Sequence, residues 1–382
     1  MREPDWPTAR RVAAAGQPLT ARAVALSGTD GLVLAAPAVA RADLPSFDTS
    51  AMDGWAVCGN GPWSPVGEVL AGHAPDLRLG PGQCCGIATG AAVPAGTTAV
   101  VRREHGRVHD GRVFAEHVAG ADIRPAGEEC WAGDVLAEVG TEVSPALIGL
   151  LAAAGLDEII VRPRPKVAVV LFGDELVDAG VAGIGLVRDS LGPQLPGWLT
   201  RMGAEVVSVS KAADTLAEHV DRIREAAATA DVVMTTGGTA AGPVDHLHSA
   251  VGQLGGTFLI DSVAVRPGHP MAMAELGGAW MVALPGNPLS AIVALLSLGT
   301  PLIDSLRGTP AGALPEVALT VDTKAPAHEH RLVASTLLGG RAAPVQHLGS
   351  AMLRGLAAAD GFAVLPPGGA VAGDVVGWLA LP

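Results

Sequence analysis

The chain of 382 residues is longer than a single hydrophobic core usually organises, so we expect about two to four domains. Its 49% of apolar residues and only 16% of charged residues exclude an intrinsically disordered protein. The formal net charge of −13 argues against a nucleic-acid-binding surface, which needs a basic field, and leaves small anions as ligands for local arginines and backbone N–H groups.

The first part of the chain alternates between helical and strand-like patterns. Residues 8–40 contain alanine-rich stretches that predict helix, and SPALIGLLAAAG (144–155) places Ser144 at an N-cap position with proline in the first turn. Between them, residues 41–140 consist of short strand-like runs separated by turn residues. We therefore expect a discontinuous helical linker domain, residues 1–40 and 141–163, with a β domain inserted at 41–140.

The following part has the pattern of an α/β domain. Three apolar runs predict buried strands: KVAVVLF (166–172), ADVVMTT (230–236) and AWMVALPG (279–286). Helical segments at 192–205 and 215–230 lie between them. Strands alternating with helices indicate a doubly wound parallel sheet covered by helices on both faces, here residues 164–309. Turn-rich strands then predict a small C-terminal β domain, residues 310–382. The fold class is thus α/β multidomain.

Neither a membrane span nor a zinc site or disulfide framework is predicted. The apolar stretch LSAIVALLSLGTPLI, which begins at Leu289, is too short to cross a bilayer and predicts a buried helix. The N-terminus has no signal-peptide pattern, so we expect a cytoplasmic protein without a membrane partner. The cysteines lack C-x-x-C spacing and are expected to be reduced core residues, and two histidine pairs are expected to lie on the surface or in loops. These residues are Cys58, Cys84, Cys85 and Cys130, and His246, His248, His328 and His330.

Three loops follow the three predicted strands: GDEL (173–176), TTGGTAAGPVD (235–245) and PGNP (285–288). In an open α/β sheet the ligand site lies outside the carboxyl ends of the strands, so these loops should converge on one crevice. Their glycines allow a phosphate to approach the backbone, and helix starts favour anions. Two alternatives remain open. The glycine pair is also compatible with an ordinary tight turn, and Asp174 with Glu175 is compatible with a first-turn helix pair.

Six motifs together resemble the MoeA/gephyrin family of molybdopterin molybdenumtransferases over essentially the whole chain. They are SFDTSAMDGWAV (46–57), IATGAAVPAGTTAVVRRE (87–104), GDEL (173–176), TTGGTAAGPVD (235–245), RPGHP (266–270) and LPGNPLSA (284–291). The resemblance implies that molybdate is inserted into adenylylated molybdopterin and AMP is released, with Mg²⁺ present. It also implies a homodimer in which the β domain of one subunit faces the αβ domain of the other. Molybdopterin adenylyltransferase and apo-molybdoenzymes are further partners that the family suggests.

The resemblance assigns roles to individual positions. Asp53 and Thr89 would project from the β domain into the partner's crevice, and Glu175 and Asp245 would complete the catalytic set. Asp174, Glu175 and Asp245 would hold Mg²⁺. The residues expected to bind the pterin, phosphate or molybdate are Gly237, Gly238, Thr239, Arg266, Pro285, Gly286, Asn287, Arg331 and Ser350. Two alternatives remain: Asp53 as a turn cap, and Ser350 as an ordinary loop serine.

Several positions depart from the family pattern. The segment that in the family ends Lys-Pro-Gly-Lys-Pro carries Arg266 and His269 instead of the two lysines, and Ser262 precedes them. Non-polar residues replace polar ones at Phe172, Leu191 and Pro243. These changes predict altered ligand use. They keep open a divergent paralogue that binds molybdopterin or another small anion without inserting metal, and a nucleotidyl-transfer enzyme that uses the same crevice.

Overall fold

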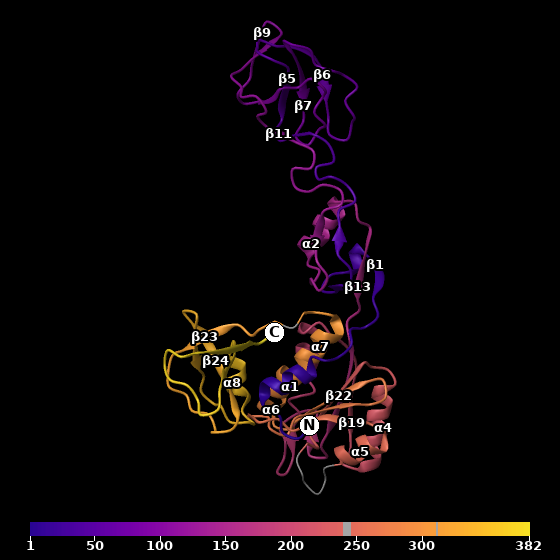
Figure 1. Ribbon diagram of the computed structural model, residues 1–382, viewed down its shortest axis with the longest axis vertical. Coiled ribbons are helices and arrows are strands. Elements are labelled where there is room, and N and C mark those ends of the chain that lie inside the picture. The colour runs from indigo at the N-terminus through magenta and orange to yellow at the C-terminus, as the bar shows by residue number, and fades with distance from the viewer. Residues whose placement is uncertain (240–245, 311) are drawn as a thin grey trace. The chain divides into compact units, whose positions relative to one another are not determined.

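The computed structural model describes residues 1–239, 246–310 and 312–382. The chain divides into two compact units, whose elements are labelled in Figure 1. Unit 1 consists of Met1–Arg22, Gly31–Ala35 and Val161–Pro382, and unit 2 of Ala23–Asp30 and Ala36–Ile160. Each unit is described by itself.

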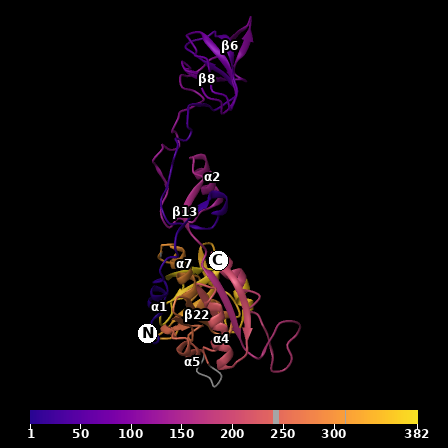
Figure 2. The ribbon, with the colours of Figure 1, turned by 90° about the vertical axis from the view of Figure 1, so that its right-hand side faces the viewer.

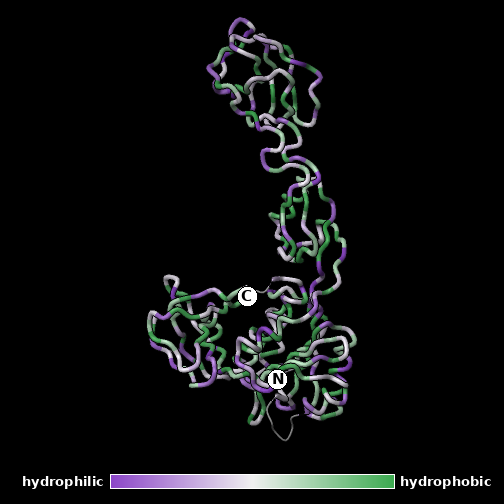
Figure 3. The backbone as a smooth tube through the Cα atoms, in the orientation of Figure 1, coloured by the Kyte–Doolittle hydropathy of each residue, from purple (hydrophilic) through white to green (hydrophobic). Residues whose placement is uncertain are grey.

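A six-stranded sheet forms the centre of unit 1. Its order is β17 (Glu205–Ala212), β14 (Lys166–Phe172), β18 (Val232–Thr236), β22 (Trp280–Leu284), β21 (Ala272–Glu275) and β19 (Thr257–Asp261). The first four strands are parallel, whereas β21 and β19 are antiparallel to their neighbours. The predicted α/β class is confirmed, and the sheet is mixed instead of entirely parallel. The tube that traces these strands is largely coloured as hydrophobic in Figure 3.

Both faces of this sheet are covered by helices, because successive strand side chains point to opposite faces. Val167, Val169 and Leu171 of β14 pack on one side, and Ala168 and Val170 on the other. The first face is covered by α3 (Leu195–Arg201), α6 (Pro288–Ala294), the π-helical segment η2 (Leu295–Gly299) and α7 (Thr300–Arg307). The second is covered by α4 (Leu216–Ala227) and α5 (Leu247–Gln253), which lie side by side in Figures 1 and 2. Each fully buried large apolar side chain contributes about 1.5–3 kcal/mol.

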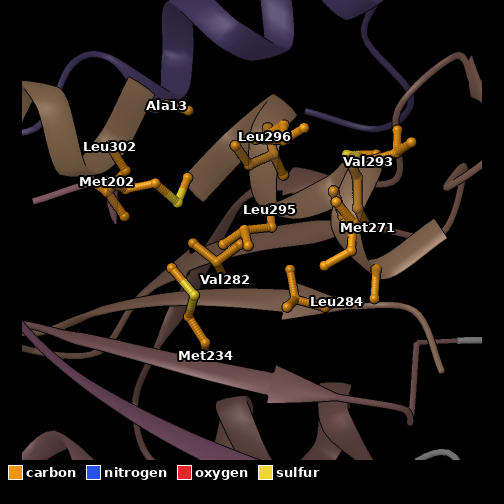
Figure 4. Packing of buried hydrophobic residues seen from close by; sticks show 14 of the residues in the cluster. Ala13, Met202, Met234, Met271, Val282, Leu284, Val293, Leu295, Leu296 and Leu302 are labelled. Carbon is orange, nitrogen blue, oxygen red and sulfur yellow. The ribbon is translucent and has the colours of Figure 1, made fainter. Parts of the chain in front are cut away.

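The apolar stretch after Leu289 is a core helix. Residues Pro288–Arg307 form a 20-residue helix that is long and apolar enough to cross a membrane, but 83% of its most apolar window is buried inside the protein. Figure 4 shows Val293, Leu295, Leu296 and Leu302 packed over Val282 and other residues of the sheet. The prediction of a buried helix is confirmed.

The N-terminal segment is helical only at its start. Helix α1 (Trp6–Ala13) begins at the N-cap Asp5, whose Oδ1 accepts a 2.7 Å hydrogen bond from the Thr8 N–H. The indole of Trp6 donates to Ser297 Oγ at 2.8 Å and so fixes α1 to η2. The prediction of helix over residues 8–40 is wrong beyond Ala13, because Gly16 and Pro18 interrupt it. The rest forms β1 (Arg22–Ala25), the 3₁₀ turn η1 (Leu26–Gly28), β2 (Val33–Leu34) and β3 (Ala38–Val39).

Unit 2 is built mainly from short strands. A four-stranded sheet has the order β6 (Ser64–Val69), β7 (Gln83–Ile87), β5 (Gly54–Val57) and β8 (Ala99–Arg102). Two-stranded ribbons join β9 (Arg107–His109) with β10 (Arg112–Phe114), β4 (Thr49–Ser50) with β11 (Ile123–Arg124), and β3 with β12 (Val135–Ala137). Helix α2 (Pro145–Ala153) starts as predicted, with Ser144 Oγ accepting from the Leu147 N–H at 3.2 Å, and β13 (Glu158–Arg162) follows it. All four cysteines are free and buried, as expected.

The C-terminal strands of unit 1 close on themselves. The strands β24 (His330–Leu338), β25 (Arg341–Pro344), β23 (Glu316–Leu319), β27 (Val375–Ala380) and β26 (Gly361–Leu365) pair in this order, and β26 pairs back with β24. Helix α8 (Leu353–Ala358) lies between β25 and β26 in the chain. The short strand β20 (Val265–Arg266) comes from the central part of unit 1 and pairs with β24. This pairing joins the central sheet region to the small barrel.

Candidate functional site

Two arginines from distant parts of the chain meet where β20 pairs with β24. The register of this parallel pair sets Val265 opposite His330 and Arg266 opposite Arg331. Together with neighbouring loops they enclose a cavity of about 360 Å³, called here the anion cavity. Its lining residues are Arg266, Pro267, Gly268, His269, Pro270, Pro285, Asn287, Ser290, Arg331, Leu348 and Ser350. Five of these were predicted as ligand-binding residues: Arg266, Pro285, Asn287, Arg331 and Ser350.

The barrel contributes Ser350 through a loop that is held against the start of α6. The carbonyl oxygen of Ser350 accepts hydrogen bonds from the N–H groups of Leu289 at 3.0 Å and Ser290 at 3.3 Å. These N–H groups lie in the first turn of α6, where a helix has no partner of its own for them. The bonds fix Ser350 beside Asn287, which is the residue just before the helix. Ser350 thus lies in a turn whose backbone is fixed by two hydrogen bonds, and its role in ligand binding stays a prediction.

The charges at the anion cavity are partly paired. Arg266 Nε donates to Glu329 Oε2 at 2.9 Å, although 53% of the arginine side chain stays exposed, and Arg331 Nη1 donates to the Lys324 carbonyl at 2.7 Å. A guanidinium has five N–H donors, so both arginines retain donors for an oxyanion. His269, at the other family lysine position, pairs through Nε2 with Glu3 Oε1 at 2.9 Å. The cavity is suited to a small oxyanion.

The glycine loop after β18 lies against the PGNP loop after β22. Gly237 and Gly238 have φ angles of 82° and 64°, which glycine adopts without the cost that other residues incur. The Gly237 N–H donates to the Leu284 carbonyl at 3.0 Å, and a Cβ on Gly286 would lie 3.8 Å from the Gly237 Cα. The predicted convergence of these two loops is confirmed. Thr239 is half-buried, and Asp245, with Pro243, lies outside the described residues.

The GDEL loop does not lead directly into a helix. After Gly173 the chain forms β15 (Leu176–Val177), which pairs in parallel with β16 (Val187–Arg188), and only then reaches α3. The interpretation of Asp174 and Glu175 as a first-turn helix pair is therefore wrong. Instead, Asp174 and Asp214 accept hydrogen bonds from each other's backbone N–H at 3.3 and 3.2 Å.

The exposed carboxylates of Asp174 and Glu175 fit the usual way in which proteins bind Mg²⁺. Mg²⁺ keeps several waters and takes one or two carboxylates together with substrate phosphates, so a complete cage of protein ligands is not required. When bound, the ion would neutralise charge on a phosphate ester.

A cavity at the end of β17 was not predicted. It measures about 340 Å³ and is lined by Leu171, Asp178, Asp189, Gly192, Pro193, Val209, Ser210 and Lys211. Lys211 forms an ion pair with Asp178, and the buried Asp189 accepts from the N–H groups of Leu191 and Gly192 at 3.0 Å each. The only sequence signal was its position: Lys211 stands at the carboxyl end of a parallel strand, which is where ligands bind such sheets. Strand β17 itself was missed, so the signal was not used.

At two of the positions that depart from the family pattern, the side chain is buried in a hydrophobic core. Leu191 is buried in the core on one face of the sheet. Phe172 is buried on the other face, where its ring stacks on His219 with centroids 3.7 Å apart and planes 8° apart. Both replacing side chains fill hydrophobic cores, and altered ligand use through the loss of polar groups at these positions stays a prediction. Arg266 and His269, in contrast, line the anion cavity.

In unit 2, Asp53 and Thr89 form one exposed pair. The backbone N–H and the hydroxyl of Thr89 donate to Asp53 Oδ1 at 2.7 and 3.0 Å. These two bonds, the backbone one first, lower the pKa of Asp53 below its ordinary value. The pair joins strand β5 to a loop 36 residues away, so Asp53 does more than cap a local turn. Gly54 beside it is required, because a Cβ there would lie 1.9 Å from the Val101 carbonyl oxygen.

Known proteins resemble the chain along its whole length. The MoeA N-terminal region (domain I and II) matches residues 6–155, a probable molybdopterin binding domain matches 168–305, and the MoeA C-terminal region (domain IV) matches 316–381. A molybdopterin molybdenumtransferase 2 of Mycobacterium tuberculosis (strain ATCC 25618 / H37Rv) is 34% identical over 366 residues, 90% of each chain. A molybdopterin molybdenumtransferase of Haemophilus influenzae is 33% identical over 275 residues, 70% of this chain and 68% of that protein.

Solved structures agree on the fold. A molybdopterin biosynthesis MoeA protein from Pyrococcus horikosii superposes with a TM-score of 0.82 at 24% identity, covering 100% of this chain and 99% of that one. A second structure, from Pyrococcus horikoshii OT3, has a TM-score of 0.76 at 20% identity with both chains covered completely. The three consecutive regions and the full-length relatives lead to one conclusion: the chain belongs to the MoeA family.

Proposed function

We propose that this chain is a molybdopterin molybdenumtransferase, which inserts molybdate into adenylylated molybdopterin and releases AMP in molybdenum cofactor biosynthesis. The observation that carries the proposal is the pairing of Arg266 with Arg331 across β20 and β24, beside Ser350. Molybdate is a small dianion, and charge-assisted hydrogen bonds from guanidinium groups position such anions. The relatives that match the chain are named for this activity.

In this proposal the molybdenum of the product is coordinated by sulfur atoms of the pterin and by no protein residue. Burial raises the pKa of the Cys84 and Cys85 thiols to about 11, so these residues carry no thiolate at neutral pH. The dithiolene of molybdopterin supplies the sulfur ligands, and the protein's residues bind and orient the two substrates. Asp174 and Glu175, with Asp245, are the residues that would hold Mg²⁺ near the phosphate ester.

A homodimer completes the site in this proposal. Asp53 and Thr89 of one subunit would face the crevice of the partner and orient the reacting groups there. Molybdopterin adenylyltransferase would supply the adenylylated substrate, and apo-molybdoenzymes would take up the product. All of these steps belong in the cytoplasm.

Arg331→Ala tests the role of the anion cavity. The variant loses one charge-assisted contact of about 1.5–3 kcal/mol, so molybdate binding should weaken roughly ten- to hundred-fold. Arg341→Ala is the matched control, because Arg341 also lies in the barrel and donates to a backbone carbonyl, that of Leu319 at 2.9 Å, without lining the cavity. Isothermal titration with molybdate measures the affinity of both variants. Equal binding by the two variants would contradict the assignment.

A non-catalytic binding protein is the second candidate. Arg266 and His269, at the two family lysine positions, are each engaged by a carboxylate, Glu329 and Glu3. This pairing reduces the positive charge available to a substrate phosphate or molybdate. Binding of adenylylated molybdopterin without release of AMP in the presence of molybdate and Mg²⁺ would favour this candidate over the transferase.

A further inference from the structure

A mixed nitrogen and oxygen cluster lies beside the anion cavity. The ligand atoms of Glu3, His269 and Glu329 all lie within 4.8 Å of one another, and this is the one such group of three among the residues that the structure describes. His269 Nε2 is 2.9 Å from Glu3 Oε1. Glu329 is the most buried member, with 16% of its side chain exposed, against 28% for His269 and 55% for Glu3.

The fold holds Glu3 in this position at a cost. Its φ angle of 49° lies in the left-handed region, which is unfavourable for a residue other than glycine. Backbone bonds on both sides keep it there: the Glu3 N–H donates to the Asp261 carbonyl at 3.3 Å, and the Ala264 N–H donates to the Pro4 carbonyl at 3.0 Å. Strained positions of this kind concentrate at ligand sites.

Two other segments complete the cluster. His269 lies in the turn between β20 and β21, and Glu329 directly precedes β24. The β20–β24 pairing that brings Arg266 to Arg331 therefore also brings His269 near Glu329. Three segments that are distant in sequence thus each present one potential metal ligand at the same point.

We propose that Glu3, His269 and Glu329 bind one divalent transition-metal ion, of which Zn²⁺ is the representative. One imidazole nitrogen with two carboxylates is a donor set that Zn²⁺ accepts, with a further position left for water or another oxygen ligand. The ion would bind the Nε2 lone pair of the neutral imidazole whose one proton is on Nδ1, and Glu3 Oε1 would bind the ion in place of its hydrogen bond to His269. Glu329 would bind through one oxygen while the other keeps its bond to Arg266. This site is distinct from the Mg²⁺ residues and does not depend on the proposed function.

Such an ion would change the charge next to the anion cavity. With His269 neutral, the carboxylates of Glu3 and Glu329 carry −2 and the guanidiniums of Arg266 and Arg331 carry +2, so the group sums to zero. A bound dication raises the sum to +2.

Isothermal titration of Zn²⁺ into untagged, chelator-treated full-length protein tests the site. We expect one ion per chain, with the affinity lowered at least about tenfold in His269→Ala and in Glu329→Gln. His248→Ala is the matched control, because His248 Nε2 pairs with Asp261 Oδ1 at 2.8 Å but belongs to no such group of three among the described residues. It should bind like the parent protein. Mg²⁺, which prefers all-oxygen sites, should not compete.

A spectroscopic measurement separates the site from adventitious binding. Co²⁺ should give a visible absorption band that Zn²⁺ removes, and the band should be absent in His269→Ala while the thermal unfolding curve of that variant stays unchanged. Absence of Zn²⁺ binding by the parent protein would overturn the proposal. So would equal binding by the parent protein and His269→Ala, or an equal loss in His248→Ala.

Discussion

The anion cavity depends on single residues whose meeting the sequence alone does not reveal. Arg266 and Arg331 are 65 positions apart and become neighbours only through the two-residue strand β20. A strand this short has no periodicity that a sequence pattern could show. Arg266, Arg331 and Ser350 were predicted only through the family resemblance. The partners of the two substituted positions, Glu329 and Glu3, were not predicted, because nothing in their local sequence marks them.

Thr89→Val should raise the pKa of Asp53 toward its ordinary value of 3.8, because the hydroxyl bond is lost while the backbone N–H bond remains. In the parent protein the charged carboxylate keeps both bonds above pH 3.8, and its contribution to stability is lost only as the pH falls through the lower folded pKa. In the variant this loss should be complete at a higher pH, because its folded pKa lies closer to the ordinary value. Carboxyl ¹³C NMR titration of Asp53 measures the change.

Thr97→Val is the control for this titration. The Thr97 hydroxyl donates to a backbone carbonyl, that of Pro94 at 2.7 Å, instead of a carboxylate. Its removal should leave the Asp53 titration unaltered. A pKa of Asp53 that stays the same in Thr89→Val would refute the assignment of the shift to this hydroxyl.

At the scale of elements, burial decided what the sequence could predict. Strands β14, β18 and β22 are buried on both faces and therefore read as continuous apolar runs. Strand β17 was missed because it is an edge strand, and its sequence EVVSVSKA mixes polar and apolar residues. Helix α2 was predicted because it carries its own capping serine and first-turn proline. The alanines after residue 13 were read as helix because alanine composition alone does not define where a helix ends.

Gly54→Ala should destabilise unit 2, because the added Cβ would lie 1.9 Å from the Val101 carbonyl oxygen on the paired strand β8. Relieving this overlap requires the strands to move apart, which costs about 1–3 kcal/mol or more. Gly86→Ala, on β7 at the other side of β5, is the control, since its Cβ would make only ordinary contacts with Glu68, the nearest at 3.4 Å to Cγ. Urea unfolding measures the free energy of unfolding of both variants. Equal stability of the two variants would contradict the packing described for β5.

At the scale of the whole molecule, the residues predicted for one site are divided between two units. Asp53 and Thr89 belong to unit 2, whereas the anion cavity belongs to unit 1. The domain order along the chain was predictable from changes in periodicity. In our proposal, unit 2 of one subunit serves the cavity of another subunit. Such sharing is not predictable from local sequence, because surfaces between subunits leave no local pattern.

Mixing Asp53→Ala with Arg331→Ala subunits tests the proposed sharing between subunits. Each homodimer should release little AMP at a molybdate concentration that saturates the parent protein but not Arg331→Ala. A mixed dimer should regain one working site, formed by the intact cavity of the Asp53→Ala chain and the intact Asp53 of the Arg331→Ala chain. The rate of AMP release by the mixture measures the activity regained in the mixed dimers. If the mixture stays as inactive as the separate variants, Asp53 does not act across a dimer.

Release of AMP is the most direct test of the central claim that this chain inserts molybdate. The purified protein is incubated with adenylylated molybdopterin, Mg²⁺ and molybdate, and AMP is measured together with reconstitution of an apo-molybdoenzyme. We predict that AMP appears only when molybdate is present and that the molybdoenzyme becomes active in proportion. Bound substrate that yields neither AMP nor active molybdoenzyme would contradict the claim and identify the chain as a binding protein.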